Sequence, residues 1–442
     1  MSVTRLPDLQ PNRPLQLPAT AERELANGLT VIGVHRPTVP LAEVRLRIPF
    51  ARAPLAEAAV LSQTLLSGTA DMSTVDIAAE LQKVGGGLSS GVDLDRLIVS
   101  GNSLVAGLDR MLSILADVLA GAVYPDDEVT TERSRLADRI RVAESQPSHL
   151  ARVALLKRIY QGHPYAVQTP EPEEVLDVSP AGLRGLHAER VHPAGATLVI
   201  VGDLETEAAL DAAERALSTW DGGGKDAELP PTPPLVPGPL TLVDRPGSVQ
   251  SSVRLALPAV PRTHPDHAAL QLANLIFGGY FSSRWVENIR EDKGYTYGPH
   301  STVEHSVAGS ALTVAAEVAT EVTAPALLET IYELGRLATM PPREQELAQA
   351  RQYALGTLQL GMSTQTGLAS LVSTYAGFGL RLDYLARHAE RLAQTTREDV
   401  AAAAARYLAP SKGVAVVLGD ADRVEGSLGA ITSVERVESE TS

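Results

Sequence analysis

Two segments of this chain repeat the same spacing of residues, and this repeat limits the folds that the chain can adopt. Residues 34–49 and 243–258 share the pattern V-x-R-P-x6-V-R-L-x-x-P, with each position 209 residues after its counterpart. Near the end of each half an apolar run followed by Gly-Asp returns, at 202–203 and at 419–420. Several matches in the same order predict an internal duplication, so the chain should fold as two copies of one unit.

The length and the segment between the copies agree with two domains. A chain of 442 residues is too long for a single core. Between the repeats, the composition is first Gly-rich and then Pro-rich, which is typical of an exposed, partly extended linker. We therefore divide the chain into an extended N-terminal segment (1–21), a first domain (22–220), a linker (221–239), a second domain (240–424) and a polar tail (425–442).

Both halves show the same series of strand and helix patterns. Residues with β propensity and apolar alternation predict four strands in each half, at 30–34, 42–49, 96–102 and 196–201, and at 240–243, 251–258, 311–318 and 414–418. Apolar residues at helical spacing predict helices at 55–66, 127–144, 267–276 and 342–359. Strands and helices are mixed without strict alternation, so the predicted class is α+β.

The composition excludes several classes of function. A net charge of −15 disfavours binding to nucleic acid, whose phosphates require clustered Lys and Arg. The chain has no cysteine, so disulfides, thiolate metal sites and cysteine nucleophiles are excluded. No run of about 18 apolar residues predicts a membrane span, and residues 1–18 have four prolines but no apolar signal core. We expect a cytoplasmic protein with no membrane partner.

The segment 277–297 carries the chain's clearest chemical signal. It is predicted to form a glycine turn, a short helix and a strand that presents Arg290 and Tyr297 seven residues apart. A guanidinium and a phenol can both donate hydrogen bonds to a peptide carbonyl and to charge that develops on its oxygen. At the offset of 209, the first half has Leu81 and Leu88 at these positions. The second copy is therefore polar where the first is apolar.

Three stretches together resemble one known family. They are Gly-His-Pro-Tyr at 162–165, Val-Gly-Asp at 201–203 and S-S-R-x5-R-x-x-x-G-x-x-Y at 282–297. With these motifs the chain resembles the insulinase/pitrilysin superfamily of zinc metallopeptidases, in its mitochondrial processing peptidase-like branch. The resemblance implies two homologous α+β domains that form one half of a clam-shaped chamber.

Active members of that family carry an inverted zinc motif, H-x-x-E-H, on the first helix of the first domain. Two histidines four residues apart share a helix face and bind one ion, and the glutamate acts as general base. The matching stretch here, 59–69, has Ala59 and Gln63 at the histidine positions and Ser62 at the glutamate position. Alanine cannot ligate a metal and serine cannot replace a carboxylate base. We therefore expect no metal and no zinc cofactor in this chain.

The family's third zinc ligand is a glutamate on a later helix. Asp138 is the nearest carboxylate in the corresponding region, and its neighbours favour a different role. Together with Arg135 and Arg141 it is expected to form a salt-bridged, solvated helix face. Neither H-E-x-x-H nor H-x-x-E-H occurs anywhere in the sequence.

Arg290 and Tyr297 match the family's Arg/Tyr pair, which lies in the second domain and faces the zinc across the chamber. A purely structural alternative pairs Arg290 with Glu287 or Glu291, and Tyr297 with Tyr295. The resemblance favours the functional interpretation.

Two other patterns do not predict a catalytic or metal site. Residues 87–91 spell G-x-S-x-G, but the predicted order of helix then strand is the reverse of the strand-to-helix turn that a serine hydrolase needs. His264, His267, His300 and His305 have no third ligand at suitable spacing, so they are expected to be surface or hydrogen-bonded histidines.

The resemblance, together with the missing zinc ligands, implies a non-catalytic subunit of a heterodimeric zinc metallopeptidase. The implied partners are a homologous catalytic subunit with H-x-x-E-H, which brings the zinc, and a peptide substrate. Arg290 and Tyr297 would supply substrate-binding and transition-state contacts to the partner's site. The alternative is an inert scaffold or a peptide-binding assembly subunit with no role in proteolysis.

Overall fold

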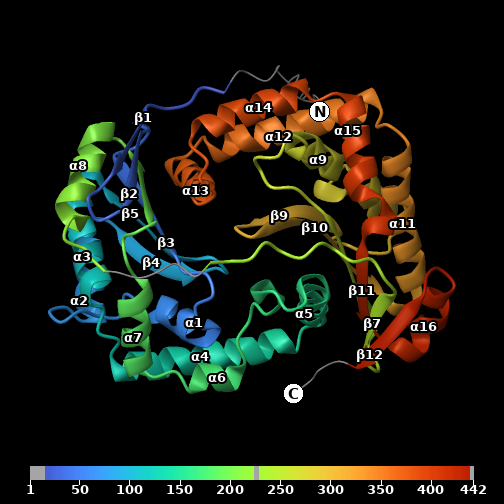
Figure 1. Ribbon diagram of the computed structural model, residues 1–442, viewed down its shortest axis with the longest axis horizontal. Coiled ribbons are helices and arrows are strands. Elements are labelled where there is room, and N and C mark those ends of the chain that lie inside the picture. The colour runs from blue at the N-terminus through green and yellow to red at the C-terminus, as the bar shows by residue number, and fades with distance from the viewer. Residues whose placement is uncertain (1–14, 223–227, 439–442) are drawn as a thin grey trace, which may run out of the picture.

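The computed structural model describes residues 15–222 and 228–438. Each half of the chain contributes one six-stranded mixed sheet, and the two sheets lie on opposite sides of the molecule with helices between and around them (Figure 1). This arrangement confirms the α+β class predicted from the sequence.

The two sheets share one topology. The first has the order β1-β2-β6-β3-β5-β4 and contains β1 (Thr20–Glu24), β2 (Thr30–His35), β3 (Leu41–Pro49), β4 (Gly87–Val92), β5 (Arg96–Leu104) and β6 (Thr197–Gly202). The second has the order β12-β7-β11-β8-β10-β9 and contains β7 (Leu240–Asp244), β8 (Gln250–Pro258), β9 (His300–Ser306), β10 (Gly309–Ala319), β11 (Val414–Gly419) and β12 (Val434–Glu438). Leaving out β1 and β12, the strands correspond one to one in order. The internal duplication is therefore visible in the topology as well as in the sequence.

The terminal strands β1 and β12 occupy equivalent edges of the two sheets. β1 pairs antiparallel with β2, whereas β12 pairs in parallel with β7. The expected polar tail from residue 425 is thus wrong for the part of it that the structure describes, because α16 (Ala421–Gly429) and β12 continue the second domain. The sequence of β12 is mostly charged because the strand forms an exposed edge of the sheet. A charged segment of this kind lacks the apolar alternation from which a strand is predicted. Residues 439–442 of the tail and 1–14 of the N-terminal segment lie outside the described residues.

Helices cover both faces of each sheet. Those of the first half are α1 (Leu55–Thr64), α2 (Thr74–Lys83), α3 (Leu108–Gly121), α4 (Asp126–Glu144), α5 (Pro147–Tyr160), α6 (Pro172–Leu176), α7 (Pro180–Arg190) and α8 (Thr206–Leu217). Those of the second half are α9 (His267–Asn274), α10 (Arg284–Val286), α11 (Thr323–Thr339), α12 (Glu344–Gly361), α13 (Gln365–Ala376), α14 (Asp383–Gln394), α15 (Arg397–Ala403) and α16. Within the described residues, no helix combines the length and the apolar composition needed to cross a bilayer.

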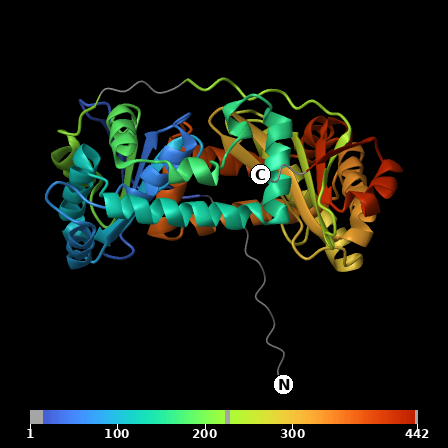
Figure 2. The same cartoon turned by 90° about the horizontal axis from the view of Figure 1, so that it is seen from below.

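The two halves exchange one helix each. α4 runs from the first half toward the second, and α5 follows it and packs on the second sheet (Figure 2). The core cluster around α5 joins apolar side chains of this helix to those of β8 and β11: Ala151, Leu155, Leu156, Ile159, Ala256, Val414, Val416 and Leu418. In return, α13 packs on the first sheet, and its cluster contains Ile32, Val34, Val199, Val201, Leu368, Ala369 and Val372.

The exchange follows from the strands at the centre of each sheet. β6 and β11 are buried on both faces, as their nearly continuous apolar sequences predict, so each sheet needs a second layer of helices. The helix that provides this layer comes from the other half. The range 22–220 leaves out the first two residues of β1 and the range 240–424 leaves out β12, and α5 and α13 each belong to the core of the opposite unit.

The linker is partly packed. In its described portion, Leu229 and Leu235 lie against the cluster around α5. The carbonyl of Pro230 accepts a hydrogen bond from Nε2 of His163 at 2.9 Å. Most residues of 228–239 are exposed, whereas Leu229 and Leu235 are partly buried. Residues 223–227 lie outside the described part.

Candidate functional site

Helix α1 carries the three residues of the zinc-motif stretch. The Ser62 hydroxyl donates to the carbonyl of Ala59 at 2.8 Å, and the Ser90 hydroxyl donates to the carbonyl of Ser62 at 2.6 Å. Ser62 is buried, whereas Gln63 is exposed. A methyl group, a hydroxyl bonded to its own helix and a solvated amide do not form a zinc site, so these residues do not fit the metal.

The described part of α4 adds no ligand. Its buried face carries Val129, Ala137 and Ile140. Asp138 is exposed and lies 3.2 Å from Arg141, which confirms the predicted surface ion pair, whereas Arg135 bonds to Glu132 instead. Across residues 15–222 and 228–438, no group of three or more His, Asp or Glu side chains could hold a metal ion.

A buried tryptophan anchors the segment that carries Arg290. Trp285 on α10 is fully buried, stacks on Phe277 with ring centroids 5.4 Å apart, and donates from Nε1 to the Thr330 hydroxyl at 2.9 Å. Because Ile289 follows at helical spacing and is also buried, the segment is fixed to the core by one face.

A buried ion pair fixes the start of the same segment. Arg284 donates from Nε and Nη2 to the two carboxylate oxygens of Glu346, at 2.8 and 2.7 Å. Burial of Glu346 acts against its charged form, but the bonds from Arg284 and Arg343 outweigh burial and lower its pKa to about 2. The carboxylate therefore remains charged at neutral pH and holds α10 against α12.

Arg290 lies on a helix, so the predicted strand is wrong at this point. After α10 the backbone continues as a π-helical turn over Glu287–Asp292, and the helix ends before Gly294, whose φ is +64°. Tyr297 lies in the loop that precedes β9. The buried spacing of Trp285 and Ile289 favours the helix over a strand here.

The structure nevertheless brings Arg290 and Tyr297 together. The guanidinium carbon of Arg290 lies 4.8 Å from the Tyr297 ring centroid and 4.4 Å from that of Phe281. Tyr297 is 86% exposed and Phe281 is also exposed. Two aromatic rings therefore hold one cation at the surface, in contact with an open hollow of about 700 Å³ that Arg290 and Tyr297 help to line.

The structural alternative for these residues holds in part. Nε of Arg290 lies 3.4 Å from a carboxylate oxygen of Glu291, which is half exposed, so the two form an ion pair at the surface. Such a pair contributes little to stability. Phe281 was not predicted to belong to this cluster, although an aromatic residue just before the S-S-R motif was a signal that could have pointed to it.

A second cluster, of three histidines, was missed by the sequence analysis. Nε2 of His267 lies 3.3 Å from Nε2 of His305, and the ring of His388 lies 4.9 Å from that of His267. Burial, with the nearby charges of His388 and His305, lowers the pKa of His267 to about 2; burial also lowers the pKa of His305 to about 3 and of His388 to about 4. All three are neutral at pH 7.

Two models of one protein family match successive parts of the chain. The family model described as "Insulinase (Peptidase family M16)" matches residues 58–173, and that described as "Peptidase M16 inactive domain" matches residues 177–353. The two matches lie in succession and together span well over half of the chain. The chain therefore belongs to the insulinase family, peptidase family M16.

Relatives and solved structures agree with this assignment. An uncharacterized zinc protease of Mycobacterium bovis is 25% identical, with 93% of this chain and 96% of the relative covered. Among solved structures, a peptidase M16 inactive domain from Pseudomonas fluorescens has a TM-score of 0.82 at 24% identity, covering 90% of this chain and 98% of that chain. A protease from Helicobacter pylori has a TM-score of 0.80 at 18% identity, covering 91% and 100%. These two structures share the fold.

Proposed function

We propose that this protein is the non-catalytic subunit of a heterodimeric zinc metallopeptidase in the processing peptidase-like branch of its family. A homologous catalytic subunit carries H-x-x-E-H and the zinc. This chain forms the other half of the chamber and contributes Arg290 and Tyr297 to the partner's site. The substrate is a peptide enclosed between the two subunits.

One contrast carries the proposal. The exposed rings of Phe281 and Tyr297 hold the partly buried Arg290 between them, while the zinc-motif positions Ala59, Ser62 and Gln63 of the same chain cannot bind metal. A solvent-exposed tyrosine next to an arginine has no structural need to be there, since neither contributes much to the core. Both groups suit a role toward a molecule outside this chain.

The chemistry of the two side chains defines that role. The Arg290 guanidinium and the Tyr297 hydroxyl act as donors toward the carbonyl oxygen of a bound peptide, which gains negative charge as water adds. Stacking between two rings limits the rotation of Arg290, so less ordering is needed when the peptide binds. Hydrolysis itself takes place at the partner's metal, outside this chain.

An inert scaffold is the second candidate. The ion pair of Arg290 with Glu291 favours it, because this contact gives Arg290 a purely local partner. A scaffold or a peptide-binding assembly subunit needs the fold and the pairing surface, but not the donors. The two candidates differ in what happens to proteolysis when the donors are removed.

The experiment begins with the purified chain, alone and mixed with a homologue that carries H-x-x-E-H. We expect the chain alone to bind no stoichiometric zinc and to cleave no peptide, and the mixture to form a one-to-one complex with peptidase activity. As a control, replacing the motif glutamate of the homologue with glutamine should abolish that activity. One zinc per chain and cleavage by this chain alone would overturn the proposal.

A further inference from the structure

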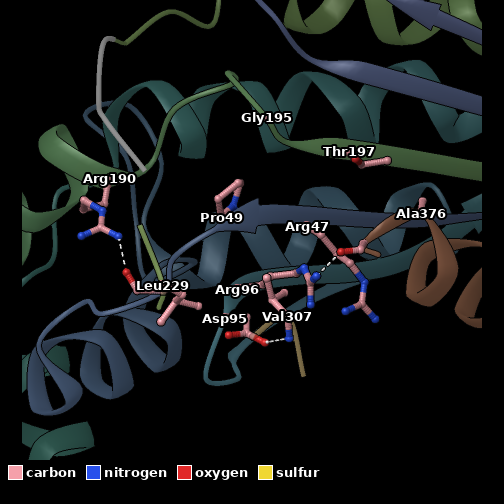
Figure 3. Close-up of a pocket in the computed structure, with 12 residues that line it drawn as sticks. Arg47, Pro49, Asp95, Arg96, Arg190, Gly195, Thr197, Leu229, Val307 and Ala376 are labelled. Atoms are coloured by element: carbon pink, nitrogen blue, oxygen red, sulfur yellow. Dashed lines mark hydrogen bonds between the residues drawn. The ribbon is translucent and has the colours of Figure 1, made fainter. Parts of the chain in front are cut away.

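A basic cavity of about 320 Å³ lies where the two halves of the molecule meet. Its charged lining residues are Arg47, Arg96, Arg190 and Asp95, and the rest of the wall is mostly apolar and comes from both halves: Pro49, Ala51, Leu229, Val307 and Ala376. Figure 3 shows Arg47 and Arg96 next to each other at one end, and Arg190 at the opposite end. A cavity of this size fits a small organic molecule.

Arg190 is the last residue of α7, and few groups around it offset its positive charge. It is 6% exposed, donates from Nη2 to the carbonyl of Ala51 at 2.6 Å, and its guanidinium carbon lies 5.8 Å from the Phe50 ring centroid. Its buried Nε has no hydrogen-bond partner among the described residues. A buried guanidinium with an unsatisfied hydrogen-bond donor destabilises the folded state unless an anion binds to it.

Arg96 and Arg47 crowd the other end. Arg96 is 8% exposed, donates from Nη2 to the carbonyl of Gly377, and lies over the ring of Phe378. Arg47 donates to the hydroxyls of Ser373 and Thr374, at 2.7 and 3.2 Å.

Like charges and burial both act on Arg47. Burial first, and then the positive charge of Arg96, lower the pKa of Arg47 below its usual range. The nearest carboxylate is that of Asp93, 3.9 Å away and partly solvated. Two guanidinium groups thus face one cavity, and their bonds are mainly to neutral oxygens.

Asp95 offsets only one of the three arginine charges that line the cavity, and its carboxylate is directed to other partners. It accepts a hydrogen bond from the Tyr165 hydroxyl and another from the amide of Val307 at 2.9 Å. The second bond ties the turn between β9 and β10 to the first half (Figure 3). Asp95 therefore serves to join the two halves, and the cavity keeps an excess of positive charge.

We propose that this cavity binds a small organic anion through carboxylate or phosphate groups, held by the guanidiniums of Arg190 at one end and Arg96 and Arg47 at the other. Guanidinium groups match both oxyanions in geometry, and the apolar wall accommodates the ligand's body. Because residues of both halves line the cavity, the bound ligand stabilises the contact between the two halves. The proposal does not depend on the peptidase partner.

Thermal unfolding of the full chain tests the site with inorganic phosphate and with succinate, each against sodium chloride at equal ionic strength. We expect at least one oxyanion to raise the Tm by roughly 2–4 °C at saturating concentration. The response should be lost in Arg190→Gln and retained in the control Arg110→Gln, whose exposed arginine pairs with Glu80 outside the cavity. A response to phosphate alone assigns the phosphate class, and one to succinate alone assigns the carboxylate class.

A second variant covers the case in which Arg190→Gln fails to fold. Thr197 lines the cavity, so Thr197→Glu places a carboxylate inside it. This variant should have a Tm in chloride at least as high as that of the unmodified chain, and it should no longer respond to oxyanions. No oxyanion response in the unmodified chain, or an undiminished response in Thr197→Glu or Arg190→Gln, overturns the proposal. The chain's net charge of −15 disfavours non-specific anion binding, which makes the response informative.

Discussion

The segments 74–83 and 284–292 occupy the same place in the duplicated order of elements, yet they bury and expose different chemistry. In the first half, α2 is a regular helix that begins with a capping box of Ser73 and Asp76 and buries Leu81. In the second half, α10 passes into a π-helical turn, buries Trp285 and turns Arg290 outward. π-helical turns within helices are frequently found at functional sites.

The difference between the two segments shows which face of a duplicated element can change. Both copies keep apolar residues on the face toward the core, because loss of that face would unfold either half. The outward face is free to change, and only the second copy has an arginine between two aromatic rings. The first copy's α1, in turn, lacks the metal ligands that the family motif requires.

The largest effect is expected when the anchor of the second segment is removed. Trp285→Ala should lower the free energy of unfolding by about 3–5 kcal/mol, because it leaves a large cavity and removes the hydrogen bond from Trp285 Nε1 to the Thr330 hydroxyl. Asp76→Asn, at the equivalent position of the exposed first segment, should lower the free energy of unfolding much less, because it only weakens the capping box with Ser73. Denaturant unfolding measures both. Equal losses would show that the two segments are anchored alike.

Acid should affect the second half more strongly through its histidine cluster. His267, His305 and His388 stay neutral when folded, with pKa values of about 2 to 4, whereas in the unfolded chain they take up protons below about pH 6.5. Stability is therefore complete above about pH 6.5 and is lost as the pH falls toward the folded values. At pH 5.5 each histidine should lower the free energy of unfolding by about 1.4 kcal/mol.

The variant His388→Gln separates this cause from general acid effects. It should reduce the loss of stability between pH 7 and pH 5.5, whereas His300→Gln, at an exposed position of β9, should leave that loss unchanged. Unfolding curves at the two pH values give the comparison. An identical pH dependence in His388→Gln and the unmodified chain would exclude the cluster as the cause.

The smallest effect on stability is expected at Arg290 itself. Its cation–aromatic contacts are at the surface, so Arg290→Ala should lower the free energy of unfolding by less than about 1 kcal/mol. Leu81→Ala, at the matching position of the first half, should cost about 2–5 kcal/mol because Leu81 is buried. A loss at Arg290 as large as that at Leu81 would make Arg290 a structural residue and weaken the proposed function.

Much of the fold follows from the sequence, for identifiable reasons. The repeated V-x-R-P-x6-V-R-L-x-x-P pattern predicts β2 with β3 and β7 with β8 to within about two residues, because apolar alternation reports directly on strand faces. The helix exchange could not be predicted in the same way. Helical periodicity shows that α5 and α13 each have an apolar face, but it does not say which sheet that face covers.

The candidate site was predictable only in part. The spacing of Arg290 and Tyr297 pointed to a pair, and the two side chains do meet, but on a helix and a loop instead of a strand. The histidine cluster was not predictable, since His267, His305 and His388 are far apart in sequence and come together only through the packing of α9, α14 and the hairpin of β9 and β10.

The kcat of the reconstituted complex, measured with Tyr297→Phe in this chain, tests the central claim most directly. The substitution removes one donor and keeps the ring that stacks on Arg290, so assembly should be unaffected. We predict a fall in kcat of about 100-fold, the effect typical of losing one transition-state donor. The control Tyr332→Phe, an exposed tyrosine on α11, should leave kcat unchanged. An unchanged kcat for Tyr297→Phe in a fully assembled complex would contradict the claim that this chain completes its partner's active site.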